Sequence, residues 1–363
     1  MVEGGPRLFE VEVKTRAKLH RGKPLSHMFW PMRSGTRLAA AWLVSGALAL
    51  GAVACGDSGS SDVVSTPPPQ PAEPEDFPSA KGKTLRELLT DAGSSGPVIA
   101  ASVSQFKPGE NRFGFALFDR AAAQIAAAPV VLYVAPVKGG PVQGPIAARF
   151  ERMDVKPTFE SVSVANDKDA AKSLYVAKID LPKPGRYELI GLARLDGRIV
   201  AATPAGGALT VTKDGPVPDV GDKAPVVDTD TVESANGNLA SIDTRKPPSS
   251  MHDVNFADVV GSKPTVLLFA TAALCQSRVC GPVIDLTEQV KSERGDEFAF
   301  VHQEIFVDNQ IDKGQRPSVA AWGLPTEPWL FVVGADGRVA ARFEGAFSAE
   351  ELNAALDRVT GKS

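Results

Sequence analysis

The stretch between Pro97 and Thr212 limits most strongly what this chain can fold into. It consists of short apolar or alternating runs separated by turn residues, among them VIAASVSQF, NRFGFALFD, PVVLYVAPV, FESVSVA, SLYVAKIDL and RYELIGLARL. Alternation of apolar and polar residues is typical of strands that are buried on one face, and no long segment here has the period of a helix. The pattern predicts an all-β antiparallel sandwich, preceded by a short helix at Thr84–Ala92, in a domain of residues 84–212.

The segment from Leu181 to Tyr187, LPKPGRY, resembles the tyrosine corner of immunoglobulin-like domains. The resemblance implies an immunoglobulin-like sandwich without a disulfide staple, because this region of the sequence holds no cysteine. The region also lacks a combination of residues that suits catalysis. We therefore expect it to act as a spacer or as a module that binds a partner.

The composition changes after residues 213–219, which are predicted to be a linker. Residues 220–363 alternate between strand-like and helix-like segments. In order, these are the strand PTVLLFATA, the helix PVIDLTEQVKSERG, the strand EFAFVHQEIF, the hairpin PWLFVVGADGRVAARFEG and the helix SAEELNAALDRV. In the last helix, Ser348 and Glu351 have the spacing of a capping box. This order predicts a second, α/β domain with one mixed sheet.

Residues 32–54 have the layout of an export signal, with two arginines followed by an uncharged apolar run and small residues. Ala52–Cys55 resembles a bacterial lipobox, in which the cysteine is lipidated and begins the mature protein. The resemblance implies that Cys55 anchors the protein on the extracytoplasmic side of a bacterial cell membrane. An uncleaved membrane anchor and plain secretion are the alternatives. Residues 1–31 precede a complete signal, so we interpret them as an over-called start.

Residues 55–83 are rich in proline, serine, glycine and acidic side chains, which predicts a disordered stalk. The formal net charge of the whole chain is -4. Beyond residue 54 the sequence has 31 of the 39 Lys and Arg residues and 40 of the 43 Asp and Glu residues. This acidic balance argues against nucleic acid as a partner.

Cys275 and Cys280 are the only cysteines outside the N-terminal region. After export, no thiol buffer keeps such a pair reduced, so a lasting disulfide is expected. Residues five apart in a regular helix have Cα atoms about 8 to 9 Å apart, whereas a disulfide needs less than about 7 Å. We therefore predict that Cys275 lies in a loop and that Pro282 falls in the first helical turn. There the helix dipole and Arg278 would favour a thiolate.

Residues 220–363 also resemble the thioredoxin-like superfamily. The resemblance rests on the lead-in Val220–Pro225, the buried strand Thr265–Thr271 that runs into the cysteines, and Thr326–Val333, which is similar to the cis-proline strand. Three features depart from that family. The cysteine spacing is C-x-x-x-x-C, and Leu274 and Leu268 stand where the family has a tryptophan and a buried acid.

The resemblance implies a thiol–disulfide oxidoreductase that acts on exported protein thiols or disulfides, or on a redox partner protein. Cys275 is expected to attack and Cys280 to resolve the mixed disulfide. The rival alignment matches Val279–Val283 to the W-C-G-P-C signature and makes Cys280 the attacker. A cis bond before Pro328 would leave the backbone of Glu327 free to position the substrate.

Other readings stay open at this point. Some one-chain peroxiredoxins share the cysteine spacing, but Leu268 and Ala272 stand where their signature has proline and threonine. A non-catalytic binding module with a structural disulfide is the second alternative. Copper binding by the cysteines with His252 or His302 is the third, although the later segment that would supply a ligand has no histidine. We expect no metal and no organic cofactor. Pro325 is the alternative candidate for the cis proline.

Overall fold

The computed structural model describes residues 71–93, 96–275 and 277–362, which all fall in one compact unit. The predicted start, signal peptide and lipidated Cys55 lie outside the described residues. Within the described ranges, no helix combines the length and the apolar character that a membrane crossing requires.

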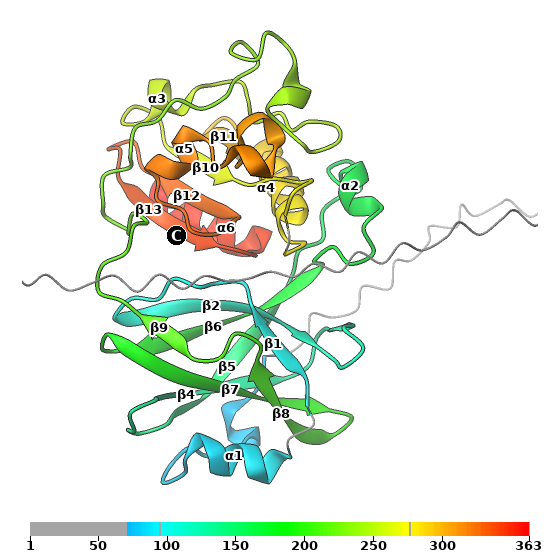
Figure 1. The fold of residues 1–363 in the computed structure, drawn as a ribbon, viewed down its shortest axis with the longest axis vertical. Coiled ribbons are helices and arrows are strands. Elements are labelled where there is room, and N and C mark those ends of the chain that lie inside the picture. The colour runs from blue at the N-terminus through cyan, green and yellow to red at the C-terminus, as the bar shows by residue number, and fades with distance from the viewer. Residues whose placement is uncertain (1–70, 94–95, 276, 363) are drawn as a thin grey trace, which may run out of the picture. The chain divides into compact units, whose positions relative to one another are not determined.

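The first nine strands of the described chain form one sheet (Figure 1). They are β1 (Val98–Ala101), β2 (Gly109–Phe118), β3 (Gln124–Ile125), β4 (Val130–Pro136), β5 (Gln143–Arg152), β6 (Ser173–Leu181), β7 (Gly185–Leu195), β8 (Arg198–Pro204) and β9 (Leu209–Val211). Seven of them form the ring β1-β8-β7-β4-β5-β6-β2, with β3 and β9 added at its margins. The ring closes because β1 pairs antiparallel with β2 and parallel with β8. This part of the chain is therefore a closed β-barrel.

The predicted immunoglobulin-like sandwich is wrong, because the strands close into a ring instead of forming two stacked sheets. β5 makes part of this closure by changing partner along its length. Ala148 pairs with Val130 of β4, and the next residue, Arg149, pairs with Val176 of β6. Sandwiches and barrels have the same local alternation of apolar residues, so pairing between distant strands distinguishes them.

Aromatic side chains fill much of the barrel interior. The ring centroids of Phe113 and Phe115 are 5.4 Å apart, and those of Phe115 and Tyr175 are 5.3 Å apart.

The predicted tyrosine-corner segment, Leu181–Tyr187, forms a local hydrogen bond, in which the Tyr187 hydroxyl donates to the Lys183 carbonyl at 3.0 Å. The alternation read from the sequence indicated strands buried on one face, but it did not show that the barrel closes.

Six helices and four 3-10 turns accompany the strands in the described part of the chain, and only two of the helices are longer than 8 residues. The helices are α1 (Leu85–Ala92), α2 (Val162–Ala165), α3 (Phe256–Val259), α4 (Cys280–Arg294), α5 (Pro317–Ala321) and α6 (Ala349–Thr360), and the 3-10 turns are η1 (Pro74–Asp76), η2 (Leu239–Ser241), η3 (Val307–Asn309) and η4 (Ile311–Lys313). Thr84 caps α1 through the capping box that it forms with Glu87. The predicted helix at this place is therefore confirmed.

Residues 71–83, predicted to belong to the stalk, pack against the barrel instead. Phe77 is buried together with Leu88 of α1 and Tyr133 of β4. The Tyr133 hydroxyl also donates a hydrogen bond to the carbonyl of Pro78 at 2.6 Å. Composition predicted a disordered segment here, but a few apolar side chains were enough to attach it to an apolar surface of the barrel.

The C-terminal part of the chain contains a second sheet of four strands. They are β10 (Thr265–Phe269), β11 (Ala299–Gln303), β12 (Trp329–Val333) and β13 (Val339–Glu344). The order is β11-β10-β12-β13, with β10 and β11 parallel and the other two pairs antiparallel. Every residue of β10, β11 and β12 is buried. Some of these side chains pack in an apolar cluster with residues of α4 and α6, and others pack in a second cluster with Phe256 and Trp322.

The predicted fold class of a sandwich followed by an α/β thioredoxin-like domain is therefore wrong. Strands dominate the described chain, which is a closed barrel with a smaller four-stranded sheet and few helices. The three expected helices are present as α1, α4 and α6. The fold class was wrong because the strands of the first part of the chain close into a barrel, which no local pattern in the sequence shows.

Polar contacts join the barrel to the four-stranded sheet. Arg112 of β2 donates to both carboxylate oxygens of Glu351 in α6, at 2.7 and 2.6 Å. Ser104, which follows β1, donates to Glu344 of β13 at 2.6 Å. Asp219, in the predicted linker, forms an ion pair with Arg342 at 3.0 Å. Asp219 also pairs with Lys107, between β1 and β2, so the linker contacts both sides of this junction.

Glu151 of β5 provides a pH test of this junction. Its side chain is only 2% exposed, and burial raises its pKa, with a further contribution from the neighbouring Glu351. The folded chain therefore binds this proton more tightly than the unfolded chain, so stability falls as pH rises from the ordinary glutamate value through the raised pKa. We expect Glu151→Gln to flatten this fall and to raise the free energy of unfolding at neutral pH.

The measurement is the free energy of unfolding of both proteins in denaturant, at pH values from about 4 to about 8. Glu110→Gln is the matched control, because Glu110 is an exposed barrel glutamate whose side chain is 65% accessible. An identical pH profile for the Glu151→Gln variant and the wild-type chain would contradict this expectation.

Candidate functional site

Cys275 and Cys280 form a disulfide with a Cα–Cα distance of 6.0 Å. The helix α4 begins at Cys280, and Cys275 lies in the loop between β10 and this helix. The predicted disulfide is therefore confirmed, as is the placement of Cys275 outside the helix. The spacing of the pair required this arrangement, because a regular helix would hold the two Cα atoms too far apart.

The sulfur of Cys275 lies at the start of α4. The backbone N–H of Cys280 donates to it at 3.3 Å, and the Ser277 hydroxyl is also 3.3 Å away. No side chain caps α4 at Val279, and the Cys275 sulfur accepts its hydrogen bond from Cys280, the first residue of the helix. Backbone N–H groups and the positive end of a helix both favour a thiolate. The arrangement would therefore stabilise negative charge on Cys275 when the disulfide is reduced.

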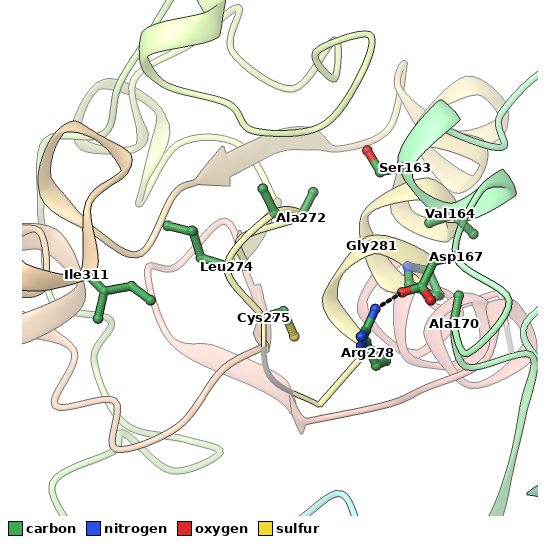
Figure 2. Close-up of a pocket in the computed structure, with 12 residues that line it drawn as sticks. Ser163, Val164, Asp167, Ala170, Ala272, Leu274, Cys275, Arg278, Gly281 and Ile311 are labelled. Carbon is green, nitrogen blue, oxygen red and sulfur yellow. Dashed lines mark hydrogen bonds and ion pairs between the residues drawn. The ribbon is translucent and has the colours of Figure 1, made fainter. Parts of the chain in front are cut away.

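The two sulfur-bearing residues differ in accessibility. Cys280 is fully buried within the apolar cluster of the four-stranded sheet, whereas Cys275 is half-buried. Cys275 lines a cavity of about 530 Å³ (Figure 2). A substrate that enters this cavity would meet Cys275 before Cys280.

One wall of the cavity comes from the connection between β5 and β6, which we call the barrel insert (residues 153–172). Its lining residues are Ser163, Val164, Asp167 and Ala170, and they face the loop that carries Leu274 and Cys275 (Figure 2). The run FESVSVA in this insert was expected to be a strand but forms α2, with Ser161 accepting a hydrogen bond from the Val164 N–H at 3.3 Å. The sequence contained no signal that linked this segment to the cysteines.

Arg278 connects the cysteine loop to the barrel insert. Its guanidinium forms an ion pair with Asp167 at 2.6 Å, and its carbonyl accepts a hydrogen bond from the Ala171 N–H at 3.1 Å (Figure 2). The ion pair lowers the pKa of Asp167 and raises that of Arg278. Arg278 was predicted to stabilise the Cys275 thiolate. In the structure its guanidinium is instead paired with the carboxylate of Asp167.

The bond between Glu327 and Pro328 is cis, as predicted, and it directly precedes β12. Phe269 at the end of β10 pairs with Trp329 at the start of β12. The cis proline and the start of the loop that carries Cys275 therefore lie at the same end of the sheet. Pro328 is buried and Glu327 is half-buried, and burial raises the pKa of the Glu327 carboxyl.

No protein-family model matches this chain, and no curated protein matches its sequence. Together with the dominance of β structure, this result contradicts the assignment to the thioredoxin-like superfamily. The function must therefore be argued from the disulfide site itself.

Proposed function

We propose that this protein is a thiol–disulfide oxidoreductase whose redox centre is the Cys275–Cys280 pair. The observation that carries the proposal is the contact between the Cys275 sulfur and the Cys280 N–H at the start of a 15-residue helix. A purely structural disulfide does not need one sulfur beside a cavity and at a place that favours its thiolate. The fully buried Cys280 is suited to act on an intermediate that is already bound to Cys275.

The reaction follows from these positions. In the reduced protein, the Cys275 thiolate attacks one sulfur of a substrate disulfide, and the other substrate sulfur leaves as a thiolate that takes up a proton. The Cys280 thiol then loses its proton and attacks the Cys275 sulfur. This step releases the second substrate thiol and restores the Cys275–Cys280 disulfide. The substrate disulfide gains two electrons and the cysteine pair loses two, and the reverse sequence oxidises a dithiol.

The proposed substrate is a cysteine of an exported protein, or of a redox partner protein, that reaches the cavity on an exposed segment. The backbone of Glu327, next to the cis Pro328, would position that segment at the end of the four-stranded sheet. The predicted lipid on Cys55 would hold the protein on the extracytoplasmic side of the membrane, where substrate disulfides persist. The chemistry uses the disulfide itself and no organic cofactor.

The reduction potential of the Cys275–Cys280 pair tests this function. We expect a value above about -300 mV, because structural disulfides of secreted proteins fall below that level. The measurement is the fraction of oxidised protein after equilibration with glutathione or dithiothreitol mixtures of known potential. A value below this limit, with no exchange toward a small aromatic disulfide, would leave a structural disulfide only.

Single-cysteine variants test the division of roles. Reduced Cys280→Ser should form a mixed disulfide with a small aromatic disulfide at least about tenfold faster than reduced Cys275→Ser, because the remaining thiol is accessible only in the first variant. The double variant Cys275→Ser/Cys280→Ser reports the background from Cys55. Equal rates in the two single variants, or a faster reaction of Cys275→Ser, would overturn the assignment of Cys275 as nucleophile.

A further inference from the structure

Three buried side chains with metal-ligating atoms meet in the C-terminal part of the chain, apart from the disulfide. His302 lies on β11, and Asp243 and His252 come from the long connection that precedes α3. All three are almost completely buried, with exposed fractions of 2% for Asp243, 1% for His252 and 0% for His302. We call them the Asp-His-His cluster. Sequence reasoning noted the two histidines but gave no reason to place Asp243 beside them.

The distances within the cluster suit coordination of one ion. Asp243 Oδ2 lies 3.1 Å from His252 Nε2 and 3.4 Å from His302 Nδ1, and the three ligand atoms all lie within 4.8 Å of one another. Zinc ligands at about 2.0 to 2.1 Å in tetrahedral geometry are about 3.3 Å apart. The Ser249 hydroxyl is 3.2 Å from His302 Nδ1, so a further oxygen lies close to the same position.

Hydrogen bonds orient the two imidazoles for this role. His252 Nδ1 is 3.2 Å from the carbonyl of Asp230, and His302 Nε2 is 3.1 Å from the carbonyl of Ala270. A carbonyl oxygen can only accept, so each of these nitrogens carries the hydrogen. In a neutral imidazole the other nitrogen then has a lone pair, and in both histidines this nitrogen faces the Asp243 carboxylate. A backbone carbonyl that holds the second nitrogen in this way is typical of histidine ligands to metals.

The Asp243 carboxylate is also oriented by hydrogen bonds. Asp243 Oδ1 accepts the Arg245 N–H at 2.8 Å, and Oδ2 accepts the Ser249 N–H at 2.6 Å. When both imidazoles are neutral, two nitrogen lone pairs face the buried carboxylate and repel it. A divalent ion between the three ligand atoms would replace this repulsion with attraction to all three.

We propose that Asp243, His252 and His302 bind one divalent transition-metal ion, and that zinc is the ion that this donor set fits best. Two imidazole nitrogens and one carboxylate oxygen suit zinc better than calcium or magnesium, which prefer all-oxygen sites. Because His302 Nε2 also holds the carbonyl of Ala270, just after β10, the ion would stabilise the start of the cysteine loop without contacting either sulfur. The proposal does not depend on the redox function proposed above.

Zinc uptake by the full chain in its oxidised form tests the proposal. After removal of metals with a chelator and long incubation with micromolar zinc, we expect about one tightly bound zinc per chain by elemental analysis. X-ray absorption of this wild-type sample should show nitrogen and oxygen neighbours at about 2.0 to 2.1 Å and no sulfur at about 2.3 Å. Failure to retain zinc, or a sulfur neighbour, would overturn the proposal even if every variant failed to fold.

Variants then assign the ligands. Asp243→Asn and His302→Gln should each weaken zinc binding by at least about 100-fold, which is more than the loss of a second-shell partner usually causes. Asp253→Asn is the matched control, since this aspartate lies in the same connection but its side chain is 68% exposed. The double variant Cys275→Ser/Cys280→Ser should bind zinc as the wild-type chain does. Unchanged zinc binding in the Asp243→Asn and His302→Gln variants would show that the ion sits elsewhere and would overturn the assignment.

Discussion

Replacing Arg245 with methionine is expected to lower the free energy of unfolding by about 3 to 5 kcal/mol, because it leaves a buried charge without its partner. The Arg245 side chain is 5% exposed and that of Asp285 in α4 is 1% exposed, and the two form an ion pair at 2.7 Å. The same guanidinium donates to the carbonyls of Phe159 and Pro247, each at 2.7 Å. Arg245→Met would remove all three contacts while keeping most of the apolar volume.

The measurement is denaturant unfolding followed by circular dichroism at neutral pH. Arg278→Met is the matched control, because it removes an ion pair to Asp167 in which the arginine side chain is 56% exposed. That variant should lose no more than about 1 kcal/mol. If both variants lost the same amount, burial would not be the reason for the importance of Arg245.

A double variant separates the contribution of the ion pair to the free energy of unfolding from the cost of leaving one charge buried alone. Burial raises the pKa of Asp285 even though Arg245 and Ser161 donate to it, so burial opposes its charged form more than these donors favour it. We therefore expect Arg245→Met/Asp285→Leu to be more stable than Arg245→Met alone, as is found when buried ion pairs are replaced by apolar residues. A double variant that is less stable than the single variant would contradict this account.

Replacing Trp322 with alanine is expected to cost about 3 to 5 kcal/mol, because it would open a large cavity in the core of the C-terminal part. The indole is fully buried, and its centroid lies 4.4 Å from the ring of Phe331 and 5.5 Å from that of Phe269. These rings belong to β12 and β10, so Trp322 packs on the two central strands of the four-stranded sheet.

Trp322→Phe distinguishes lost volume from a lost hydrogen bond. The indole N–H has no hydrogen-bond partner among the residues that the structure describes. Phenylalanine would therefore remove an unsatisfied donor while keeping an aromatic ring, and we expect it to cost much less than alanine. Both variants are compared in denaturant unfolding with Val226→Ala, which shortens a side chain that is 67% exposed. Equal losses for the alanine and phenylalanine variants would contradict the packing argument.

Part of the candidate site could be predicted from the sequence. The C-x-x-x-x-C spacing was enough to place Cys275 outside the helix, because the argument needed only helix geometry and the length of a disulfide. Export, inferred from residues 32–54, gave the reason to expect an oxidised pair. The cis bond before Pro328 was expected from the resemblance of Thr326–Val333 to a cis-proline strand, and this bond is present although the family assignment is wrong.

The rest of the site could not be predicted, because it is formed by segments that are far apart in the sequence. Asp167 lies 111 residues before Arg278, yet the two form an ion pair beside Cys275. Asp243 and His302 approach each other only because the long connection before α3 folds onto β11. Neither contact produces a local pattern such as periodicity, capping or turn chemistry.

The sequence alone determined the local features of this protein: the alternating strands between Pro97 and Thr212, the capped helix that begins after Thr84, and the place of the disulfide at a helix start. The tertiary structure decided what those pieces became. β1 had to pair with β8 before the strands could form a barrel rather than a sandwich. Local periodicity reports which face of a strand is buried, whereas closure and site assembly depend on pairings between distant residues.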